Sequence, residues 1–324
     1  MQNVREVEPR GPKLPMYSTS PKRLWIPIVS CIVGAGLLSI ALNFGSAIWK
    51  MEYQIADPSL GLGANIIDAV IFIGIGAAAA FILIKIVRRR GINALEKIMT
   101  LAFLVLGTFI LWLYGMYILI LINELVPVDG SWEYIWMAAA FCIALGLVWL
   151  YASPRFAERQ GIHNLVVVIF GVLIGSYLAS LIGTWTSLII LAGFALYDIY
   201  SVRKGPIKEM MKQFDQGAAG GDLTALDLDD ITIDIGIGDL AFYSMLTSLT
   251  LISTEWGGPV LVAISGNPGL YLIPFAAAVT GVLIGAWISF ELVKKNKILP
   301  GLPMSIFIGI GLYSLAIGVC MLFI

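Results

Sequence analysis

The sequence is poor in charged residues. Only 13% of its 324 residues are Asp, Glu, Lys or Arg, whereas 59% are hydrophobic. A soluble domain carries roughly 25% charged residues, so this chain has too little polar surface to face water alone. The excess hydrophobic side chains must face lipid. A net charge of −1 gives no reason to expect a nucleic-acid partner.

Histidine and cysteine are also scarce. The only histidine is His163, at the start of an apolar run, which argues against a histidine-based metal site or a Ser-His-Asp triad. Cys31, Cys142 and Cys320 lie inside apolar runs and match no metal-ligand spacing. They are interpreted as small buried apolar residues. The sequence therefore predicts no metal site and no cofactor.

Long hydrophobic segments are abundant. A helix needs about 20 apolar residues to cross the hydrocarbon core. Segments that approach or exceed this length cover 24–48, 64–87, 97–123, 133–152, 162–180, 183–203, 234–254, 269–292 and 298–324. The sequence predicts an all-α, polytopic membrane protein with about nine transmembrane helices.

The basic residues predict the orientation of these segments. With nine spans, 19 of the 20 Lys and Arg residues fall on the side of the N-terminus, and only Lys50 falls on the other. Cytoplasmic loops are enriched in Lys and Arg, so the N-terminus is predicted to be cytoplasmic and the C-terminus outside. In a prokaryote this membrane would be the cell membrane.

The chain divides into three predicted parts. Residues 1–204 form an N-terminal part with helices one to six, and residues 234–324 form a C-terminal part with helices seven to nine. Residues 205–233 contain a glycine-rich stretch and several aspartates, a composition typical of a flexible loop, here cytoplasmic. No convincing internal repeat is present, which weakens the case for a transporter built from inverted halves.

Two carboxyl groups are predicted to lie within spans, where charge is costly and suggests function. Asp198 lies five residues before Arg203 in span six, and Asp239 lies five residues after Asp234 in span seven. Each is then about 7–8 Å inside its helix end, at a matched depth on antiparallel helices expected to be neighbours. Four other carboxyl groups are expected at the membrane interfaces, namely Asp68, Glu96, Asp234 and Glu291.

A pair of neighbouring carboxyl groups has a defined chemistry. Two carboxyl groups a few ångström apart share a proton. The ionised member can deprotonate water while the protonated member polarises a peptide carbonyl, which is general acid–base hydrolysis. A buried acidic pair would equally suit an ion-coupled transporter or channel. The residues alone leave both alternatives open.

Further residues surround the predicted pair. Tyr197 precedes Asp198, and Gly236 and Gly238 precede Asp239, where glycine allows close approach by a neighbouring helix or a substrate strand. Span nine opens with Leu299-Pro300-Gly301-Leu302-Pro303. Its prolines lack N–H donors and leave carbonyl groups free near the membrane surface. Proline is also favoured in the first turn of any helix, so this motif alone is a weak signal.

Together these motifs resemble the presenilin and signal-peptide-peptidase family of intramembrane aspartyl proteases. The match comprises Tyr197-Asp198, Gly236-Ile237-Gly238-Asp239 and Pro300-Gly301-Leu302, in the family's order on spans six, seven and nine. The sequence departs from the family at Gly301, where the family has alanine. The compact length resembles that of a microbial, archaeal homologue.

The resemblance implies specific roles. Asp198 and Asp239 would be the catalytic pair, with Tyr197, Gly236, Gly238, Pro300, Gly301 and Leu302 as support for the active site. The partners would be the lipid bilayer and transmembrane peptides or membrane-protein substrates that enter laterally, and a homo-oligomer is possible. The predicted orientation is that of presenilins and favours substrate helices whose N-terminus is outside. Prepilin peptidases share the G-x-G-D pattern, but the span count and the Pro300 motif argue against them.

Overall fold

The computed structural model describes residues 16–19, 23, 25–46, 61–126, 129–153, 160–204, 233–252, 268–295 and 302–322. These residues form nine helices and two short strands. In chain order the elements are β1 (Met16–Thr19), α1 (Trp25–Ser46), α2 (Leu62–Arg90), α3 (Ile92–Leu125), α4 (Ser131–Ala152), α6 (Gln160–Leu181), α7 (Thr184–Lys204), β2 (Ile233–Gly236), α9 (Ile237–Ile252), α11 (Pro268–Lys295) and α12 (Leu302–Met321).

Each predicted span corresponds to one of these helices, so the predicted all-α membrane fold is confirmed. Six helices are long and apolar enough to cross a membrane, namely α2, α3, α4, α6, α11 and α12. The apolar parts of α1, α7 and α9 are shorter, covering Trp25–Ile40, Thr184–Tyr200 and Ile237–Ile252. A count of nine crossings stays a prediction. The predicted flexible loop lies, apart from Ile233, outside the described residues.

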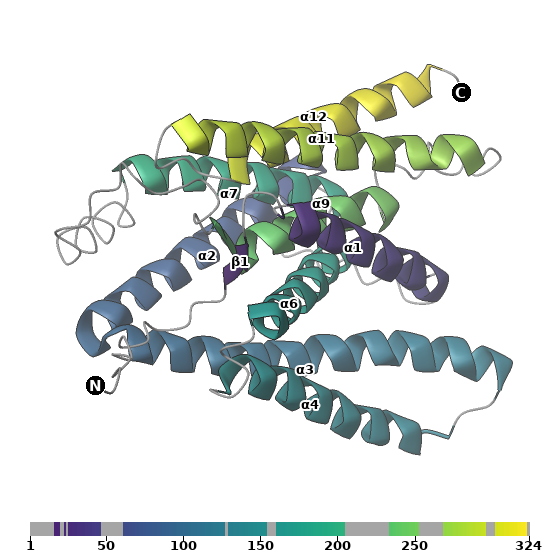
Figure 1. The fold of residues 1–324 in the computed structure, drawn as a ribbon. Helices are drawn as coiled ribbons and strands as arrows, with labels where there is room; N and C mark the ends of the chain where they lie inside the picture. Colours follow the sequence, from purple (N-terminus) through teal and green to yellow (C-terminus); the bar gives the residue numbers. More distant parts are fainter. Residues whose placement is uncertain are drawn as a thin grey trace, which may run out of the picture.

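The helices form a layered bundle around α9 (Figure 1). Helices α11 and α12 lie side by side at one edge, and α3 and α4 form an antiparallel pair at the opposite edge. Helix α9 lies between them and packs mainly on α6 and α1. Every residue from Leu240 to Leu251 except Phe242 is buried. Helix α9 therefore forms the centre of the protein core, and Asp239 is attached to this rigid element.

Small residues allow the close helix contacts. A Cβ atom on Gly175 of α6 would lie 2.8 Å from the backbone nitrogen of Met245 in α9. A Cβ atom on Gly281 of α11 would lie 2.6 Å from the Cα atom of Gly309 in α12. Membrane helices associate largely through such close van der Waals packing, because lipid supplies no hydrophobic driving force between them.

Alanine at Gly281 should therefore destabilise the protein. The added methyl group meets backbone rather than a movable side chain, so α11 and α12 must separate. Overpacking of this kind costs about 1–3 kcal/mol. Gly311 of α12 is exposed, and a Cβ atom there meets no atom within 4 Å, so Gly311→Ala is the matched control. We expect the thermal unfolding midpoint in detergent to fall for Gly281→Ala only. Equal midpoints for the two variants would contradict this packing.

Strands β1 and β2 pair antiparallel at one end of the bundle, with Tyr17 opposite Ile235 and Met16 opposite Gly236. The prediction of a helix from residue 234 is wrong at its start, because 233–236 are extended and α9 begins at Ile237. Tyr17 packs against the helical core, and this burial raises the pKa of its phenol. The N-terminal segment thus holds the backbone that leads directly into α9.

Candidate active site

Asp198 lies six residues before the last residue of α7 and is half-buried. Helix α7 packs mainly on α2 and α12 and touches α9 over only a few residues. The two aspartate-bearing helices are therefore neighbours, as predicted, but the contact between them is small. The limited contact nevertheless includes the rings of Phe194 and Phe242, whose centroids are 5.3 Å apart.

Asp239 lies in the first turn of α9 and is half-buried. We predicted a depth of about 7–8 Å inside its helix, which is wrong because β2 replaces the first residues of that helix. The N-terminal turn of a helix carries free N–H groups and the positive end of the helix dipole. The dipole therefore offsets part of the cost of placing a carboxylate at Asp239.

The two phenylalanines set the relative level of the aspartates. Phe194 lies four residues before Asp198, and Phe242 lies three residues after Asp239. Because α7 and α9 are antiparallel, each phenylalanine lies about one helical turn from its aspartate, in both cases toward the middle of the bundle. The contact between the rings therefore brings the carboxyl groups to one level, where Asp198 and Asp239 interact electrostatically.

The start of α12 reaches the same site. The backbone N–H of Leu302 donates a hydrogen bond to the carboxylate of Asp198. Leu302 is buried and is the first residue of α12, so its N–H has no partner within the helix. Pro300 and Gly301 lie outside the described residues. The three segments singled out in the sequence therefore converge through Asp198, Asp239 and Leu302.

The remaining predicted support residues lie close in sequence. Tyr197 is half-buried on α7, Gly236 ends β2, and Gly238 is exposed in the first turn of α9. A Cβ atom on Gly238 would meet no atom within 4 Å, and one on Gly236 only the backbone nitrogen of Gly238 at 4.0 Å. Among the described residues no helix approaches these glycines, contrary to one of our expectations. The described residues leave space beside Gly238 instead.

Tyr243 is a site residue that we did not predict. It is only 4% exposed, interacts electrostatically with both Asp239 and Asp198, and lies next to the buried Ser305. The signal was present in the spacing, because residues four apart share one face of a helix. Tyr243 therefore places a phenol group beside the carboxyl pair.

One further expectation is corrected and another stays a prediction. Asp68 is 1% exposed near the start of α2, and its predicted position at the membrane interface stays a prediction. It lies near the hydrogen bond from Thr186 to Asn65, and Thr186 is about 18 Å along α7 from Asp198, so Asp68 is separate from the pair. Cys142 was expected to be buried but is exposed on α4. His163 stacks on Tyr151 with ring centroids 4.9 Å apart.

Similarity to known proteins is found in sequence and in fold. Presenilin-B of Dictyostelium discoideum is 30% identical over 182 residues, which cover 54% of this chain and 33% of Presenilin-B. The match thus spans about one third of that relative's length. No protein-family model matches the chain.

The fold comparison covers nearly the whole molecule. The structure of a presenilin family intramembrane aspartate protease superposes with a TM-score of 0.57 over 92% of this chain and 99% of that chain, at 17% sequence identity. At this identity the match shows the fold alone. Taken together, the chain is similar in sequence to one presenilin and in fold to a presenilin-family structure, and its long apolar helices indicate a multi-pass membrane protein.

Proposed function

We propose that this protein is an intramembrane aspartyl endopeptidase that hydrolyses peptide bonds within or near transmembrane helices. The observation that carries the proposal is the meeting of Asp198, Asp239 and the Leu302 N–H at one level of the bundle. The presenilin-like fold supports the same reading. A scaffold without catalytic activity would give no reason to place two carboxyl groups together inside an apolar bundle.

The proposed reaction is general acid–base hydrolysis by the pair, which shares one proton. The ionised carboxylate takes a proton from a water molecule as the water oxygen attacks the peptide carbonyl carbon. The protonated carboxyl group donates its proton to the carbonyl oxygen. Collapse of this intermediate, a carbon bearing two hydroxyl groups, breaks the C–N bond. The protonated carboxyl group donates its proton to the leaving nitrogen while the carboxylate takes a proton from one hydroxyl group, so the pair again holds one proton. The titration belongs to the pair, so neither aspartate is assigned as acid or base alone.

The surroundings suit an extended peptide. Gly238 is exposed, and no described residue comes within 4 Å of a Cβ atom built on it, which leaves room for a peptide in the turn that carries Asp239. A substrate helix would have to unwind locally, because the amide bonds of a helix are shielded by its own hydrogen bonds. The positive-inside pattern predicts the presenilin orientation, and the resemblance to that family then implies substrates whose N-terminus lies outside.

The deciding experiment compares proteolysis with transport. The purified full chain should cleave a labelled single-span peptide in detergent, with products located by mass spectrometry. In liposomes it should carry no ion flux. Flux through the protein together with an intact peptide would overturn the proposal in favour of an ion-coupled transporter, which is the alternative use of a buried acidic pair.

The strand pair offers a second test. Tyr17→Pro/Ser18→Pro removes two N–H donors from β1 and breaks its pairing with β2. Because β2 leads into the turn that carries Asp239, we expect cleavage to fall about tenfold, with little change in thermal stability, since the helices bury most of the core. Tyr17→Thr/Ser18→Thr keeps both donors and should retain activity. Equal activity of the two double variants would exclude a role for this pairing.

A further inference from the structure

A pocket of about 500 Å³ lies at the elbow between α2 and α3, away from the aspartates. Four of its eight lining side chains are cationic, namely Lys85, Arg89 and Arg90 of α2 and Lys97 of α3, and none is acidic. The other four are apolar and include Ile86 and Ile98. A cluster of like charges around one space raises the local concentration of anions.

The backbone of the elbow brings these charges together. Gly91 has φ 76°, a value that side-chain-bearing residues rarely adopt, and it separates the two helices by a single residue. Its N–H bonds to the Val87 carbonyl at 2.9 Å, and its own carbonyl accepts from Ala94 N–H at 3.2 Å. Helix α3 therefore begins directly after α2, and its one lining cation, Lys97, comes close to the three of α2.

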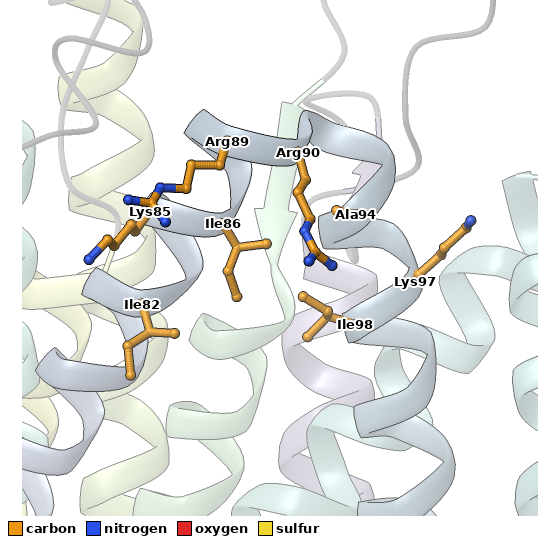
Figure 2. Close-up of a pocket in the computed structure, with 8 residues that line it drawn as sticks. All are labelled: Ile82, Lys85, Ile86, Arg89, Arg90, Ala94, Lys97 and Ile98. Carbon is orange, nitrogen blue, oxygen red and sulfur yellow. The ribbon is translucent and has the colours of Figure 1, made fainter.

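Figure 2 shows how the lining side chains lie. The guanidinium of Arg90 and the side chains of Ile86 and Ile98 point into the space between the helices, whereas Lys97 extends outward from α3. Lys85 and Arg89 lie together on the α2 side. The pocket thus combines a cationic rim with apolar walls.

The flank of α2 below the cations is apolar and open. The most apolar 18-residue stretch of α2 has no buried side chain, and Phe81 and Ile82 are 68% and 56% exposed. A soluble anion would bury no apolar surface against these two side chains. A phospholipid would, because its headgroup would meet the cations while its acyl chain lay along α2.

The pocket lies at the same end of the bundle as Asp198. Helices α2 and α7 run parallel, since Asn65 meets Thr186 and Gly76 lies against Phe194. In this register Lys85 lies about 8 Å beyond the level of Asp198, toward the helix ends. This end is the one that the charge pattern predicts to be cytoplasmic, where anionic lipid is available to bind.

We propose that the pocket between α2 and α3 binds the phosphate headgroup of an anionic phospholipid, with an acyl chain against Phe81 and Ile82. This site is independent of the proposed proteolysis, because no lining residue belongs to the carboxyl pair.

In the test, the purified full chain is exposed to a mixture of phosphatidylglycerol and phosphatidylcholine. Native mass spectrometry then measures how much of each lipid the protein retains. We expect at least tenfold preference for phosphatidylglycerol. Arg90→Gln should lower that preference about fivefold and Arg89→Gln/Arg90→Gln should abolish it, while Arg90→Lys stays within about twofold of the wild type. Arg23→Gln, an exposed basic residue outside the pocket, is the control and should change nothing.

Three results would overturn the proposal. The first is retention without preference between the two lipids. The second is an equal effect of Arg23→Gln and Arg90→Gln, which would indicate a diffuse basic surface. The third is displacement of phosphatidylglycerol by millimolar inorganic phosphate, which would indicate a site for small anions. Asp198→Asn should bind lipid like the wild type. A failure of the lipid proposal can therefore be distinguished from a failure of the proposed proteolysis.

Discussion

Replacement of Asp198 or Asp239 by asparagine is expected to lower peptide cleavage about a thousandfold or more. Asparagine has nearly the same shape as aspartate but can neither take a proton from water nor give one to the carbonyl oxygen. General acid–base catalysis contributes about 10²–10⁴-fold to a rate, and both steps require the pair. The measurement is the initial rate of cleavage of a single-span peptide by each purified variant.

A variant that lacks both aspartates tests whether the two act as one catalytic unit. Residues that act as one catalytic unit are strongly non-additive, so Asp198→Asn/Asp239→Asn should be no slower than either single variant. The control is Asp68→Asn, which removes another buried carboxyl group from α2, far from the pair. It should keep at least about a tenth of the activity, since the chemistry does not involve it. Cleavage that survives either single substitution at the pair would refute the mechanism.

Leu302→Pro is expected to lower cleavage about ten- to a hundredfold. Proline has no N–H, so the substitution removes the donor that binds the Asp198 carboxylate. A hydrogen bond to a charged group contributes about 1.5–3 kcal/mol, which corresponds to this range of rates. Leu302 is the first residue of α12, a position where helices accept proline, so the helix itself should persist.

Leu302→Ala separates the loss of the donor from the loss of packing. Alanine keeps the N–H but truncates a side chain that is 3% exposed. We expect this variant to lose thermal stability but to retain most of its rate per folded molecule. Equal rates for the proline and alanine variants, both corrected for the folded fraction, would show that the Leu302 N–H does not act on Asp198.

The helices were predictable because the lipid environment leaves a chain few alternatives. Unpaired backbone groups are so costly in hydrocarbon that long apolar segments become helices, and each predicted span matches a helix. Asp198 and Asp239 stood out for a related reason, because carboxyl groups are rare inside such segments. Hydropathy and charge therefore sufficed to select the two aspartates.

The local geometry at Asp239 was not predictable in the same way. Ile233-Asp234-Ile235-Gly236 continues the apolar segment, so hydropathy extends the helix through it. The extended conformation depends on pairing with Met16–Thr19, more than 200 residues earlier in the chain. Only tertiary structure brings such distant segments together. The result is an aspartate in the first turn of its helix.

The groups that contact the two aspartates were also not predictable, because tertiary packing determines them. The prolines of the last span suggested free carbonyl groups, whereas the contact made by Leu302 is an N–H donated to Asp198. Helix α7 packs more on α2 and α12 than on α9, its neighbour in the sequence of spans, and no rule of sequence order predicts this. Tyr243 was identifiable from its spacing to Asp239, but only its burial and its electrostatic contact with both carboxyl groups give it a place in the site.

The most direct test of the shared carboxyl site is the binding of a transition-state mimic. The probe is a substrate peptide in which a carbon bearing a hydroxyl group replaces the scissile carbonyl, so that the hydroxyl sits where both carboxyl groups would hold the attacking water. Its dissociation constant is measured on the wild type, Asp198→Asn and Asp239→Asn. We predict tight binding by the wild type and at least about hundredfold weaker binding by each variant. Equal affinity for all three proteins would contradict the account.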